Sequence, residues 1–147
     1  MPSTIPELCD AITDELNGAN FAPLTLTAER AFVPKREVKS MGANIVALVV
    51  PVSVQHERLS RAVDQKRIVI HIGIQKRLED ADDNDEVDEL INLSQEVALY
   101  FRALKMTAVP DMFWTAGDTP TAFSGEHYDE YAVFTAIASL TYLQTTG

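Results

Sequence analysis

The residues best suited to acid–base chemistry or metal binding are three histidines. His56, His71 and His127 lie far apart in the chain, and none has a cysteine or second histidine at the short spacing of a zinc site. His127 is the strongest of the three candidates because Glu126 and Asp129 lie beside it. An exposed loop histidine is nevertheless the commoner outcome of such a pattern. We therefore predict no metal site and no cofactor.

A tract of carboxylates from Glu79 to Glu86 raises the question of calcium binding. From Asp80 onward, side-chain oxygens alternate along the chain as they do in an EF-hand loop. The sixth position of that loop is glycine and the twelfth is glutamate, whereas this chain has Asp85 and Ile91 there. We expect a solvated surface whose carboxylates complement the dipole of the helix that follows.

No nucleophile has the surroundings that catalysis requires. The sequence contains no Gly-x-Ser-x-Gly elbow, no phosphate-binding glycine loop and no dinucleotide fingerprint. Its one cysteine, Cys9, lies among apolar positions of a predicted helix, which favours packing over reactivity. Phe113 and Trp114 could stack on a base or a sugar, but an aromatic pair in a strand more often belongs to the core. We predict no catalytic residue and a protein that is not an enzyme.

The composition is that of one acidic globular domain. With 147 residues, 46% of them hydrophobic and 23% charged, the chain is predicted to fold as a single domain, residues 1–147. A formal net charge of −10 makes tight DNA binding unfavourable, because phosphate contacts need lysine and arginine. The longest apolar run, Ile45 to Val52, is too short for a membrane helix. The N-terminus shows no basic stretch before an apolar one, so we expect a soluble protein made in the cytoplasm.

Hydrophobic periodicity predicts a helix followed by three strands. Thr4 and Glu7 form a capping-box pattern, and apolar residues follow at helical spacing. An edge strand and a loop are expected between Phe21 and Gly42. Ile45 to Gln55 is predicted to be a strand largely buried on both faces, and Ile68 to Leu78 a strand with alternate isoleucines on one face.

The second half of the chain predicts one more helix and two more strands. The helix extends from about Asp85 to Leu104, and the strands occupy Thr107 to Thr115 and Tyr131 to Thr145. The segment between these strands, Ala116 to Asp129, contains glycine and proline and is predicted to be a loop. The predicted fold class is α+β: a mainly antiparallel sheet of four to five strands with two helices packed on one face.

Two polar segments are the candidates for contact with a partner. His56 to Arg67 connects two predicted strands as the long tip of an antiparallel hairpin, and it is longer and more charged than sheet stability requires. Its basic residues are more often the solvated ends of strands and loops, and that interpretation of their charge comes first. Ala116 to Asp129 is the other candidate. The residues predicted to contact another subunit or a partner are His56, Arg58, Arg61, Lys66, Arg67, Phe123, His127 and Tyr128.

Five stretches of the chain follow one another in a recognisable order. They are Arg30-Ala31-Phe32-Val33-Pro34, Ile45 to Val54, Arg61 to Leu78 with Ile72-Gly73-Ile74-Gln75-Lys76-Arg77, the helix Asp85 to Leu104, and Phe134 to Leu143 with Leu140-Thr141-Tyr142. This order is similar to that of the tail-terminator and tail-completion (neck) family of tailed phages and prophages, to which the lambda tail terminator belongs. The similarity covers nearly the whole chain.

This resemblance implies a structural protein of the virion, assembled in the cytoplasm of the bacterial host and located in the tail–neck region. Such a subunit forms a homo-oligomeric ring, a hexamer, that caps the tail tube protein and presents a surface to the head–tail connector protein. DNA is only passing cargo, no membrane or cofactor is involved, and the family has no catalytic residues to carry over.

Two alternatives stay open at this point. The first is another neck protein, either a head-closure or an adaptor subunit. The second is a small ligand-binding domain or enzyme that uses His127, Asp129 and Trp114.

Overall fold

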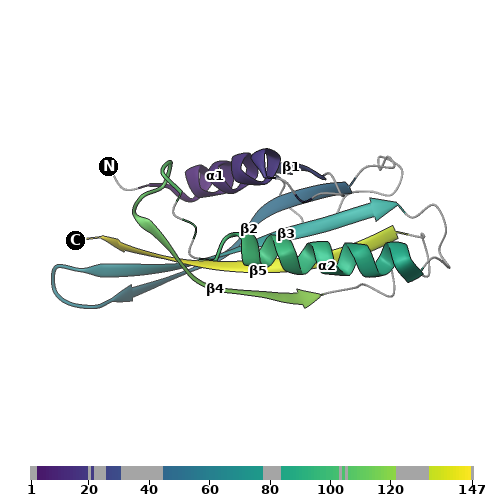
Figure 1. The fold of residues 1–147 in the computed structure, drawn as a ribbon. Helices are drawn as coiled ribbons and strands as arrows, with labels where there is room; N and C mark the ends of the chain where they lie inside the picture. Colours follow the sequence, from purple (N-terminus) through teal and green to yellow (C-terminus); the bar gives the residue numbers. More distant parts are fainter. Residues whose placement is uncertain are drawn as a thin grey trace.

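The computed structural model has an α+β fold, as the sequence predicts, with two helices and a five-stranded sheet (Figure 1). The elements are α1 (Ile5–Gly18), β1 (Leu26–Arg30), β2 (Ile45–Arg58), β3 (Asp64–Arg77), α2 (Asn84–Tyr100), β4 (Met112–Thr121) and β5 (Val133–Thr146). The strand order is β1-β2-β3-β5-β4, in which β1 is parallel to β2 and every other pair is antiparallel. The structure describes residues 3–19, 21, 26–30, 45–77, 84–102, 104, 106–121 and 133–146.

Helix α1 begins where the capping box places it. The Thr4 hydroxyl accepts a hydrogen bond from the Glu7 backbone N–H at 3.3 Å, and the Glu7 carboxylate accepts one from the Thr4 N–H at 3.2 Å. Near its other end, the Asn17 side-chain amide pairs with the backbone of Ala28, accepting from its N–H at 2.8 Å and donating to its carbonyl at 3.1 Å. This pairing fixes β1 beside the end of the helix.

The three long strands build the face of the sheet that the helices cover. Ile68, Ile70, Ile72 and Ile74 of β3 all point to this face and are fully buried. Their partners in β5 on the same face are also buried: Ala136, Ala138, Leu140 and Tyr142. Buried residues of both helices join the same core, so the two helices cover one face, as predicted.

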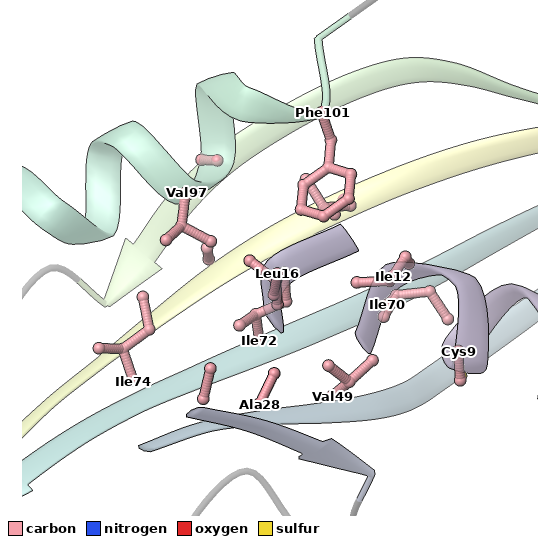
Figure 2. Close-up of a cluster of buried hydrophobic side chains, with 14 of the residues drawn as sticks. Cys9, Ile12, Leu16, Ala28, Val49, Ile70, Ile72, Ile74, Val97 and Phe101 are labelled. Atoms are coloured by element: carbon pink, nitrogen blue, oxygen red, sulfur yellow. The ribbon is translucent and has the colours of Figure 1, made fainter. Parts of the chain in front are cut away.

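Figure 2 shows how the two helices share this core. Ile12 and Leu16 of α1 lie over Ile70 and Ile72, and Val97 of α2 lies beyond them over the same side of the sheet. Each helix contributes the apolar stripe that its periodicity predicts. The core is therefore one cluster with members from all three thirds of the chain.

The opposite face of β2 is buried over only part of its length. Leu48 and Val50 point away from the helices and are nevertheless buried, next to the buried pair Gln75 and Thr135, whose side chains are hydrogen-bonded at 3.3 Å. The prediction of a strand buried on both faces is thus correct up to Val50 and wrong beyond it.

Three predicted boundaries are corrected by the structure. Most of the predicted connection from His56 to Arg67 is strand, because β2 continues to Arg58 and β3 begins at Asp64. Helix α2 ends at Tyr100 rather than Leu104, since the chain there forms shorter turns around the buried Phe101. Strand β4 extends through the start of the predicted loop to Thr121. It is an edge strand with two register shifts, and the second, between Asp118 and Thr121, contains Pro120.

Candidate functional site

A long hairpin extends past the hydrophobic core at one end of the sheet, and we call residues 51–67 the arm (Figure 1). The last buried residue of β3 toward the hairpin turn is Ile68, which lies opposite Val54. Pairing of β2 with β3 then continues to Arg58 opposite Asp64. Strand β5 runs along the other side of β3 as far as Thr146, and we include its residues 143–146 in the arm, which therefore has three strands with β3 in the middle.

Local sequence explains where the arm starts and how it turns. Strand β1 pairs with β2 only as far as Val49, so β2 is an edge strand beyond that point within the described part of the chain. Pro51 and the register shift that follows it suit an edge, because proline cannot donate to a neighbouring strand. At the turn, the Ser60 hydroxyl accepts from the Val63 N–H at 3.1 Å, and the Val63 carbonyl accepts from the Leu59 N–H at 2.9 Å.

The arm has almost no hydrophobic core of its own. Every residue of β2 from Pro51 to Arg58 is exposed except the half-buried Val54. Val52 is 50% exposed and Leu59, in the turn, is 52% exposed. A hairpin that buries neither face is marginally stable in water. The paired strands of the arm therefore extend farther than the hydrophobic packing of the arm itself would stabilise.

The arm carries basic residues on an otherwise acidic molecule. Both helices contain aspartate and glutamate but no lysine or arginine. By contrast, the arm contains Arg58, Arg61, Lys66 and Arg67. Arg58 pairs weakly with Asp64 across the hairpin at 3.6 Å, and both side chains are well exposed. Among the described residues, no ion pair involves the other three basic side chains.

A hollow of about 440 Å³ lies on the arm and is lined by Gln55, His56, Glu57, Gln65 and Arg67. Most of these side chains point to the face of the sheet that lies away from the helices. The same row of the sheet continues from Arg67 through Leu143 to Phe113, whose side chain is 59% exposed. A polar hollow beside an exposed aromatic ring is a surface that a partner could cover.

A polar cluster closes the core at the base of the arm. The Asp111 carboxylate accepts hydrogen bonds from both the backbone N–H (2.9 Å) and the hydroxyl of Ser3, and from the Gln144 side-chain amide at 2.6 Å. The Gln144 amide also donates to the Ser3 carbonyl at 2.8 Å. The pKa of Asp111 is lowered to about 2. The main cause is hydrogen bonding by Ser3, which outweighs the opposite effect of burial, and hydrogen bonding by Gln144 lowers the pKa further. Since Gln144 lies opposite Lys66 in β3, this cluster marks where the core ends and the arm begins.

Two buried polar atoms lack a hydrogen-bond partner among the described residues: the Tyr142 hydroxyl and the Trp114 indole nitrogen. The two residues are directly opposite each other in β5 and β4, on the helix side of the sheet. Burial, and then the negative charge of Glu15, raise the pKa of Tyr142. This hydroxyl is therefore neutral and has little acid–base use.

The predicted contact residues divide into two groups. His56, Arg58, Arg61, Lys66 and Arg67 all lie on the arm, which brings them together. Phe123, His127 and Tyr128, together with Asp129, lie outside the described residues.

Sequence reasoning missed three features near this site. It placed Phe113 and Trp114 together in the core, whereas only Trp114 points inward. It also did not find the contact of Ser3 and Asp111, because nothing local links residues that are 108 positions apart. The hydrophobic alternation of β5 could have signalled Gln144, a polar residue at a core-facing position.

The described residues contain no group of histidine, cysteine, aspartate and glutamate side chains that could hold a metal ion. Neither of their helices is long and apolar enough to cross a membrane. Cys9 is buried, and burial is the main cause of its raised thiol pKa, so a reactive thiolate is disfavoured there. No protein-family model matches the chain, and no curated protein is significantly similar to it.

Proposed function

We propose that this chain is a structural assembly protein of a tailed phage or prophage that forms a ring at the end of the tail tube. The observation that carries the proposal is the arm, a three-stranded extension of the sheet whose β2 strand is almost entirely exposed and in which basic side chains outnumber acidic ones. A charged extension that lies beyond the hydrophobic core is a candidate surface for contact with another subunit. The α+β fold agrees with the small subunit that the resemblance to tail terminators implies.

Different parts of the fold have different roles in this proposal. The core beneath the two helices keeps the sheet rigid, and the arm contacts the next subunit. Closed rings use heterologous contacts, in which two different surfaces of the same subunit meet around the ring. The net charge of −10 suits a channel that DNA passes through, since like charges keep the DNA from adhering. The ring would end the tail tube and offer its other side to the head–tail connector.

The first test is the mass of the purified protein across a range of concentrations, by light scattering and native mass spectrometry, with negative-stain imaging of the same samples. We expect a hexamer, with rings in the images. A closed dimer with two-fold symmetry would contradict the proposal, because an isologous contact leaves no surface with which to extend a ring.

A second test locates the protein in the particle. Antibodies against the chain, applied to virions from a lysate of the source strain, should label the junction of tail and head. Virions that lack the chain would rule out a tail-terminator role. They would equally rule out the runner-up, a head-closure or adaptor subunit, since all of these remain in the finished particle.

A further inference from the structure

The arm and the outer side of α2 are complementary surfaces on the same chain. The exposed residues of α2 recur every three or four positions and form one stripe along the helix: Asp85, Asp88, Glu89, Asn92, Gln95, Glu96 and Leu99. Among the described residues, Asp88, Glu89 and Glu96 have no ion pair. The stripe is thus acidic along most of its length and ends at Leu99, which is 61% exposed.

The arm carries mainly basic side chains, opposite in charge to those of the stripe. Arg61, Lys66 and Arg67 supply positive charge, and Leu59 is an exposed apolar residue at its turn. On the arm four basic side chains outnumber Glu57 and Asp64, so each surface combines a net charge of one sign with one exposed leucine. Contact between them would cover the solvated strands of the arm and neutralise charge on both sides.

The two surfaces cannot meet within one subunit. Strand β3 runs from the arm to Arg77, and its 14 residues span about 45 Å at 3.3 Å per residue. Helix α2 begins shortly after the far end of β3, so the acidic residues of its first two turns lie at the opposite end of the molecule from the hairpin turn (Figure 1). The strands of the arm are paired on both sides of β3 and do not fold back.

We propose that the arm of one subunit lies on the acidic stripe of α2 in a second copy of this chain. The contact is heterologous, because the two surfaces differ. Repeated from subunit to subunit it forms a ring if the series of contacts closes, and in that respect it rests on the proposed function. Nucleic acid is the other partner that a basic arm could bind. The arm is attached to a molecule with a net charge of −10, which repels DNA, whereas the same charge distribution attracts the arm of another copy.

Charge reversal on both surfaces tests this contact. The arm variant combines Arg61→Glu with Arg67→Glu, and the stripe variant combines Asp88→Lys with Glu89→Lys. All four residues are exposed, so we expect both variants to fold, which circular dichroism checks. Each variant should weaken self-association at least about tenfold, because like charges then face each other. Combining them restores both complementarity and the original net charge, and should return the dissociation constant to within about threefold of the original protein.

Two controls separate local contact from overall charge. Arg102→Glu and Asp14→Lys reverse exposed charges that lie outside the arm and the stripe, and they should leave self-association unchanged. Raising the salt concentration from 0.05 to 0.5 M should weaken association of the original protein, since the charges meet at a solvated surface.

The outcomes distinguish this contact from the ring itself. Loss of association in each variant with recovery in their combination supports the contact, even if the assembly is an open chain, in which case only the ring proposal fails. Rings that persist in both variants overturn the contact and leave the ring proposal standing. Disruption without recovery, or an original protein that stays monomeric at every concentration, also overturns it. The contact is also overturned if the original protein binds a DNA oligonucleotide, the arm variant loses that binding, and self-association of the variant is unaffected.

Discussion

The carboxylate of Asp111 should make the stability of this protein depend on pH in one narrow range. In the folded protein its pKa is lowered from 3.8 to about 2 by the hydrogen bonds from Ser3 and Gln144. A carboxyl whose pKa is lower in the folded state stabilises that state above its unfolded pKa, and the stabilisation is lost as pH falls through the folded pKa. The relevant range is therefore from about pH 5 down to about pH 2.

The size of the effect follows from the same values. The lowered pKa corresponds to at most about 2.5 kcal/mol at pH 7. Because the Asp111 side chain is only partly buried, solvent screening reduces this to about 1 kcal/mol. About half of that contribution should already be lost at pH 3, where the unfolded chain is largely protonated at this position.

Urea denaturation of Asp111→Asn and of the original protein, at pH 7 and at pH 3 and at one fixed protein concentration, measures this contribution. The variant should be less stable by about 1 kcal/mol at pH 7, and the difference should shrink by about half at pH 3. Asp14→Asn, at an exposed position of α1, serves as the matched control and should show no such change. An equal difference at the two pH values would refute the assignment, because it would mean that the Asp111 charge contributes nothing.

Three further substitutions test the packing around the core by the same denaturation assay. Thr4→Ala removes the capping box of α1 and should cost about 1 kcal/mol, whereas Thr4→Ser should cost much less; equal losses would mean that the hydroxyl is not the stabilising group. Tyr142→Phe removes a buried hydroxyl for which the described residues supply no hydrogen-bond partner, so it should be neutral or stabilising, and a loss above about 1 kcal/mol would reveal a partner for that oxygen. Gly117→Ala places a methyl group 3.3 Å from the ring of Trp114, so it should cost up to about 1 kcal/mol and shift the fluorescence of this single tryptophan. An unchanged emission spectrum would show that the ring does not need to move.

The sequence determined those features whose cause is local. The capping box of Thr4 and Glu7 satisfies orphan N–H groups within one turn, so the start of α1 is visible in four residues. The alternating isoleucines of β3 could form a buried strand face and little else, because side chains in a strand alternate between faces. The order of helices and strands, the fold class and the basic character of the hairpin follow from such patterns.

The boundaries of the strands were decided by tertiary structure. Polar residues after Gln55 remain in β2 because β3 supplies their hydrogen-bond partners, and β3 is in turn held by β5, which begins 56 residues after β3 ends. Neighbouring strands satisfy backbone groups whatever the side chains are, so hydrophobic periodicity cannot show where pairing ends. The sequence therefore predicted a long polar connection where the structure has a three-stranded arm.

The surroundings of individual side chains also depended on the fold. Asp111 receives its hydrogen bonds from Ser3 and Gln144, which the sheet brings to it from the two ends of the chain. In β4, Phe113 is exposed and Trp114 points inward because neighbouring residues of a strand face opposite sides, and only the register with β5 decides which residue faces the helices. Composition made the arm basic and α2 acidic, but only the folded chain places the arm and the first turns of α2 at opposite ends of one molecule, because the length of β3 separates them.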